Sequence, residues 1–128
     1  MIWAPTDDHE YAKESFFAKH PREIFNSGEF NIVPTMVGAT KDEGLLYTAN
    51  HFVDPNKYSI YETEWSRCAS KTFLGRYYDE LTKQDQEKLN LIAEYYFKDG
   101  FSFENAFQNW TDAFGDSGFL YGTEVLAR

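Results

Sequence analysis

Residues 32–38 place the strongest constraint on how this chain can fold. Their apolar side chains follow one another without alternation, which is typical of a strand buried on both faces. Such a strand needs a neighbour on each side, because its backbone groups otherwise lack hydrogen-bond partners. Residues 3–6 offer one further short strand. The pattern therefore predicts an α/β protein whose sheet is largely built by residues outside these 128.

Helical patterns account for most of the remaining sequence. Pro21 suits the first turn of one helix and Gly28 suits its end. Thr82 suits an N-cap, with acidic residues following it in the first turn. The predicted helices cover residues 20–28, 45–52, 61–73, 82–98, 102–114 and 117–128. The expected architecture is one or two sheet strands with several covering helices, cut at both ends within an element.

The net charge of −9 argues against nucleic acid and anionic membranes as partners, because both need basic patches. No apolar run reaches transmembrane length. Cys68 is the single cysteine, so no disulfide can close within the chain, and the sequence leaves open whether this thiol pairs elsewhere. The aromatic residues make up 19% of the chain and recur at helical spacing over residues 95–121, which favours core packing.

The stretch from Ser27 to Gly44 reads SGEFNIVPTMVGATKDEG. It closely resembles a segment of type-B carboxylesterases and cholinesterases, where a Ser-Gly-x-Phe-Asn turn, a strand ending in Gly and then Lys-Asp-Glu-Gly follow a short helix. Residues 3–8 and 116–121 look like two flanking segments of the same family, although Gly122 stands where the family often has Pro. Residues 20–24 look most like insect members.

The resemblance implies that residues 1–128 are part of a single carboxylesterase type-B domain, an α/β-hydrolase truncated at both ends. It implies that Glu43 is the acid of a Ser-His-Glu triad and that Leu46 and Tyr47 line the substrate pocket. The neighbouring Asp42 is expected to turn away. The position of Glu43 also makes physical sense, because catalytic groups of α/β sheets gather just after the strands. An Asp-Glu pair without this context is ordinarily a solvated loop feature.

The other members of a triad are missing from the sequence. No Gly-x-Ser-x-Gly nucleophile motif occurs. The three histidines also fail as the catalytic base, because His9 and His20 precede Glu43 and His51 follows it by only eight residues. The expected order in this fold is Ser, then acid, then His. This chain alone is therefore expected to show no esterase activity.

The predicted function is serine-dependent hydrolysis of a small-molecule carboxylic ester, with no cofactor and no metal, in a protein that includes the remainder of the domain. Two alternatives stay open: part of a non-catalytic cholinesterase-like adhesion protein, and a free-standing acidic helical interaction domain. Asn109, in Asn-Trp-Thr, is a candidate for N-glycosylation. The resemblance favours secretion, and a cytoplasmic location stays open. The ester substrate is not determined.

Overall fold

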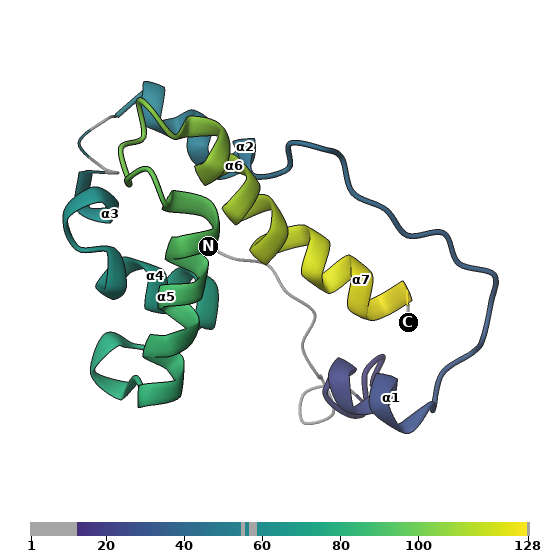
Figure 1. The fold of residues 1–128 in the computed structure, drawn as a ribbon. Helices are drawn as coiled ribbons and strands as arrows, with labels where there is room; N and C mark the ends of the chain where they lie inside the picture. Colours follow the sequence, from purple (N-terminus) through teal and green to yellow (C-terminus); the bar gives the residue numbers. More distant parts are fainter. Residues whose placement is uncertain (1–12, 55, 57–58, 128) are drawn as a thin grey trace. The chain divides into compact units, whose positions relative to one another are not determined.

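A computed structural model describes residues 13–54, 56 and 59–127, which fall into two units, Met1–Met36 and Val37–Arg128. Helix α1 (Pro21–Ser27) lies in the first unit (Figure 1). Its predicted limits are confirmed: Pro21 occupies the first turn, and Gly28 ends the helix at a φ of +71°, where a residue without Cβ is least strained. The imidazole of His20 caps the helix, because its Nδ1 accepts a hydrogen bond from the backbone of Arg22.

The prediction of an α/β fold is wrong for the residues that the structure describes, since no strand occurs among them. Residues 31–40 carry no regular secondary structure (Figure 1). Ile32 and Met36, predicted to be buried, are 92% and 96% exposed. The physical reason is that a strand needs a second strand to bond its amides and cover its side chains, and the described part of the chain supplies none. The strand expected at residues 3–6 lies outside the described residues.

The second unit is helical throughout its regular structure. Its elements are α2 (Leu45–Thr48), η1 (Ala49–Phe52), α3 (Ser59–Thr63), α4 (Trp65–Leu74), η3 (Tyr78–Glu80), α5 (Lys83–Phe97), α6 (Phe107–Gly115), η4 (Asp116–Leu120) and α7 (Tyr121–Ala127). The last three follow one another without a break and form one continuous rod, with the π-helical turn η4 in its middle (Figure 1). The single helix predicted over residues 61–73 is instead two helices, because Glu64 leaves the helical conformation.

Helix α5 begins where its sequence predicts. The hydroxyl of Thr82 accepts a hydrogen bond from the backbone N–H of Asp85 at 3.2 Å, and the Asp85 carboxylate accepts one from the backbone N–H of Thr82 at 3.1 Å. This reciprocal capping box satisfies two backbone donors that an uncapped helix leaves free. The helix then buries Leu89 and Phe97 on its apolar face.

The core of the second unit is aromatic and centres on Trp110. Its indole stacks on Phe103 with ring centroids 4.4 Å apart, and its Nε1 donates a hydrogen bond to the carbonyl of Phe101. The buried cluster consists of Phe97, Phe103, Trp110, Ala113 and Phe114. The predicted core packing of residues 95–121 is confirmed for these four aromatic side chains, whereas Tyr95 and Tyr121 are 77% and 70% exposed. Helix α6 supplies three of the five, so it is the element on which α2 and α5 assemble.

Candidate functional site

Glu43 lies in a turn directly before α2. The carbonyls of Asp42 and Glu43 accept hydrogen bonds from the backbone of Leu45 and Leu46 at 3.0 and 3.1 Å, so the turn leads straight into the helix. The Oε1 atom of Glu43 accepts a hydrogen bond from the backbone N–H of Thr40 at 2.9 Å. Within the described residues this is the one hydrogen bond that its half-buried carboxylate makes. The local backbone thus holds one carboxylate oxygen and leaves the other available.

A cavity of about 350 Å³ adjoins this carboxylate. Its walls come from the turn, from the end of α5 and from α6 with η4. The lining residues are Thr40, Lys41, Glu43, Tyr95, Tyr96, Asn109, Asp112, Gly115, Asp116 and Leu120. Three carboxylates and one ammonium group therefore line the cavity. An excess of negative charge of this kind favours a cationic or hydrogen-bond-donating group inside it.

Asp42 takes a different direction from its neighbour. Its Oδ1 accepts a hydrogen bond from Nε2 of Gln108 on α6 at 3.1 Å, and Asp42 is not part of the cavity wall. The adjacent carboxylates are therefore separated by their partners: Asp42 is held by a side chain of α6, while Glu43 is held by its own turn. The sequence motif singled out Glu43 and left Gln108 unnoticed.

Gly44 is present because the turn approaches the backbone of α6 too closely for any larger residue. A Cβ atom at this position would lie 1.8 Å from the carbonyl oxygen of Thr111 and 2.8 Å from the backbone nitrogen of Gly115. One helical turn further on, the buried hydroxyls of Thr48 and Thr111 are hydrogen-bonded at 2.9 Å. These contacts fix the beginning of α2 on α6, and with it the turn that carries Glu43.

Tyr96 and Asp116 hold α5 against the helical rod at the far side of the cavity. The Tyr96 hydroxyl donates a hydrogen bond to the Asp116 carboxylate. Burial and this neighbouring carboxylate together raise the pKa of the Tyr96 phenol, so it remains the donor at neutral pH. The sequence resemblance included Asp116 without assigning it a role; its tyrosine partner is 20 residues away and carried no sequence signal.

Leu46 and Tyr47, predicted to line a substrate pocket, do not line the cavity beside Glu43. Leu46 is 66% exposed. The ring centroid of Tyr47 lies 5.4 Å from that of Phe114 and 6.3 Å from that of Phe119. Their role in a substrate pocket stays a prediction. Glycosylation of Asn109 also stays a prediction; this residue lies within α6, and its Nδ2 donates a hydrogen bond to the carbonyl of Tyr96.

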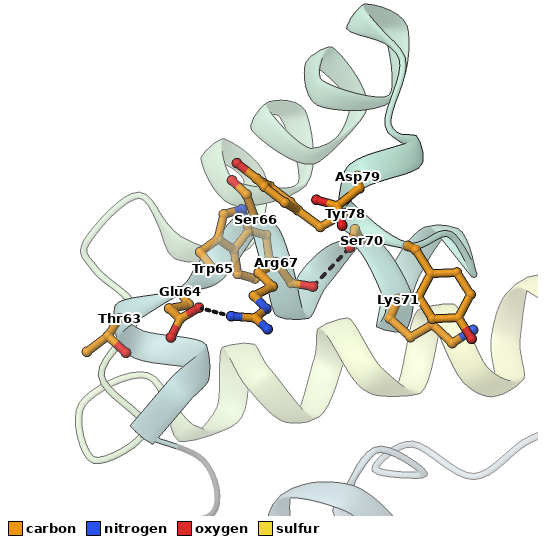
Figure 2. Close-up of a pocket in the computed structure, with 10 residues that line it drawn as sticks. Thr63, Glu64, Trp65, Ser66, Arg67, Ser70, Lys71, Tyr78 and Asp79 are labelled. Carbon is orange, nitrogen blue, oxygen red and sulfur yellow. Dashed lines mark hydrogen bonds and ion pairs between the residues drawn. The ribbon is translucent and has the colours of Figure 1, made fainter.

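A larger cavity, of about 860 Å³, lies elsewhere in the second unit along α4 and η3 (Figure 2). Three of its charged side chains are already engaged within the cavity wall. Arg67 points to Glu64 and bonds it at 3.1 Å, and the Lys71 ammonium lies 4.3 Å from the centroid of the Tyr77 ring. No residue of the Lys-Asp-Glu-Gly segment lines this cavity. The smaller cavity beside Glu43 is therefore the candidate site.

Other kinds of site have less support in the structure. Among the described residues, no group of three or more His, Cys, Asp or Glu side chains is arranged to hold a metal ion. Within the same residues, no helix combines the length and apolar character needed to cross a bilayer. Burial, followed by the nearby Glu64 carboxylate, raises the pKa of the Cys68 thiol, which reduces the fraction of reactive thiolate.

The sequence was also compared with known proteins. A family model described as Carboxylesterase family matches residues 1–128, the whole of the chain. No curated protein and no solved structure matches it. The chain therefore belongs to the carboxylesterase family, which confirms the resemblance seen in residues 27–44. Membership of this family supports a hydrolase-type enzyme in the full-length protein, and the family implies ester substrates.

Proposed function

We propose that the complete protein is a serine carboxylesterase, that residues 1–128 are part of its single catalytic domain, and that Glu43 is the acid of its Ser-His-Glu triad. The observation that carries this proposal is the position of Glu43. It is the glutamate of the Lys-Asp-Glu-Gly motif, and its carboxylate lines a polar cavity in which one of its oxygens has no hydrogen bond from the described residues.

In this role Glu43 holds the catalytic imidazole and does not itself attack the ester. Its carboxylate accepts the Nδ1–H of the histidine, which leaves Nε2 free to take the proton of the nucleophilic serine. When the imidazole becomes imidazolium, the carboxylate stabilises the new charge. Asp112 and Asp116 on the same cavity wall act in the same direction, because nearby negative charges favour a protonated imidazole.

The rest of the reaction is carried out by groups outside these residues. The serine forms an acyl-enzyme as the alcohol leaves, and water, activated by the same histidine, then releases the carboxylic acid. The nucleophile and the base have no counterpart in this sequence. The leucine and tyrosine at the start of α2, Leu46 and Tyr47, are proposed as part of the substrate pocket formed with the remainder of the domain.

The test uses the complete protein and a nitrophenyl ester. We expect Glu43→Gln to lower kcat by about a thousandfold or more, because the amide neither fixes the imidazole tautomer nor balances its charge. Asp42→Asn is the matched control, since it removes a carboxylate one residue away, and we expect kcat within about twofold of the wild type. The isolated 128-residue chain is expected to be inactive. Near-normal turnover of Glu43→Gln would remove Glu43 from the triad, and a complete protein with no turnover would favour the binding-protein alternative.

A further inference from the structure

The side-chain amide of Gln108 lies between two carboxylates. Its Nε2 donates to Oδ1 of Asp42 at 3.1 Å and to Oδ1 of Asp112 at 2.8 Å. An ionised carboxylate only accepts hydrogen bonds, and an amide NH₂ group carries two hydrogens, so a single glutamine can bond both acids at once. It thereby joins two like charges that would otherwise repel each other.

Gln108 belongs to a face of α6 that carries the turn and the start of α2. Gln108, Thr111 and Gly115 are spaced by three and four residues, so they lie along one side of the helix. Thr111 bonds Thr48, and Gly115 lies against Gly44. These two contacts fix the backbone of the segment. The contact of Gln108 is different in kind, because it fixes the direction of one side chain.

That direction matters because Asp42 and Glu43 carry the same functional group on adjacent residues. Because the two carboxylates are chemically alike, only their positions determine which of them can bond the catalytic histidine. Glu43 lines the cavity, while Asp42, bound to Gln108, does not. Gln108 makes no hydrogen bond with Glu43 itself. Gln108 can therefore act on the site only through the two carboxylates that it bonds, and of these Asp112 already lies on the cavity wall whereas Asp42 does not.

We propose that Gln108 is a positioning residue, which holds the Asp42 carboxylate against α6 so that Glu43 alone is presented to the catalytic histidine. This inference rests on the proposed function, because it concerns the same carboxylate site. When the amide is lost, Asp42 and Asp112 repel each other without a shared donor. Asp42 then leaves α6, and its charge moves toward the site and competes with Glu43 for the imidazole.

The experiment is a double-mutant cycle in the complete protein, with kcat and KM measured on a nitrophenyl ester. Gln108→Leu keeps the size of the side chain and removes the amide. We expect it to lower kcat about tenfold, as a displaced catalytic group does, and to leave KM within about twofold. In an Asp42→Ala background, the same substitution is expected to have no further effect, since the carboxylate that it releases is absent. Gln84→Leu, an exposed glutamine of α5, is the matched control and keeps wild-type kinetics.

Two results overturn the positioning role. One is a Gln108→Leu variant with wild-type kcat, in a protein that Glu43→Gln inactivates. The other is an equal loss of kcat on Gln108→Leu with and without Asp42, which would show that the effect passes through Asp112 or the packing of α6 and not through Asp42. In both cases the triad assignment of Glu43 survives. Near-normal kcat of Glu43→Gln instead overturns the triad assignment and this inference with it.

Discussion

Replacing Gly44 by alanine tests the packing of the motif on α6. The backbone of Gly44 is right-handed helical, with φ −62° and ψ −16°, so alanine brings no conformational strain. Its methyl group would nevertheless lie 1.8 Å from the Thr111 carbonyl oxygen, where ordinary contact begins near 3.4 Å. The start of α2 must therefore retreat by roughly 1.5 Å from a neighbour that is backbone and cannot rotate away.

The cost follows from that displacement. Overpacking of a well-filled contact costs about 1–3 kcal/mol, and the rigid neighbour places Gly44→Ala at the upper end. The retreat also stretches the hydrogen bond between Thr48 and Thr111, which adds about 1 kcal/mol. We expect the free energy of unfolding to fall by about 3–4 kcal/mol. With an m value of about 2 kcal/mol/M, the urea midpoint falls by about 1.5–2 M.

The assay is urea unfolding of the chain, followed by tryptophan fluorescence, because Trp110 is fully buried in the core. Gly122→Ala in α7 is the matched control, since a Cβ atom there meets nothing within 4 Å. The free energy of unfolding of this control is expected to rise by about 0.5–1 kcal/mol, because alanine has a higher helix propensity than glycine. If Gly44→Ala proves as stable as Gly122→Ala, the close approach of the turn to α6 is wrong, and so is the argument that α6 fixes the position of Glu43.

Two further predictions concern the stability of the helical unit. Thr48→Val and Thr111→Val are each expected to lower the free energy of unfolding by about 0.5–1.5 kcal/mol, because each removes the bond between the two hydroxyls while the remaining hydroxyl still bonds a backbone carbonyl of its own helix or turn. Urea unfolding of the double variant should show less than the sum of the two losses, and additive losses would contradict a direct bond. The hydrogen bonds from Thr82 lower the pKa of Asp85 below its usual 3.8. The ionised carboxylate therefore stabilises the fold at pH values above 3.8. This contribution is lost as the pH falls through the lowered pKa. The urea midpoint of the wild type should therefore decrease as the pH is lowered from about 5 to about 2. The Asp85→Asn variant should lack this part of the decrease. Identical pH profiles for the two proteins would show that the capping box does not titrate.

Helix limits were the part of the fold that local sequence predicted best. Thr82 and Asp85 are three residues apart, and Pro21 and Gly28 frame a single short helix, so the hydrogen bonds that begin or end these helices are local. The break at Glu64 was missed, because the residues on both sides of it favour helix and nothing in the local pattern distinguishes one helix from two.

The strand predicted at residues 32–38 shows what a sequence pattern cannot predict by itself. Its apolar run meets the requirement for a buried strand, yet a strand exists only when another segment bonds its backbone. Within the described residues no such segment is present, and the side chains stay exposed. The residue types of a segment determine which secondary structure it favours, whereas a neighbouring strand determines whether the favoured strand forms.

The sequence by itself determined the family, through the 18 residues from Ser27 to Gly44, and it determined which acid to examine. The tertiary structure alone decided how that acid is set apart from its neighbour. The bond between Asp42 and Gln108 spans 66 residues, and the contact of Gly44 with Thr111 spans a similar length of chain. A motif is read from adjacent residues, while the direction of a side chain is decided by whatever the fold brings beside it, and here that element is α6.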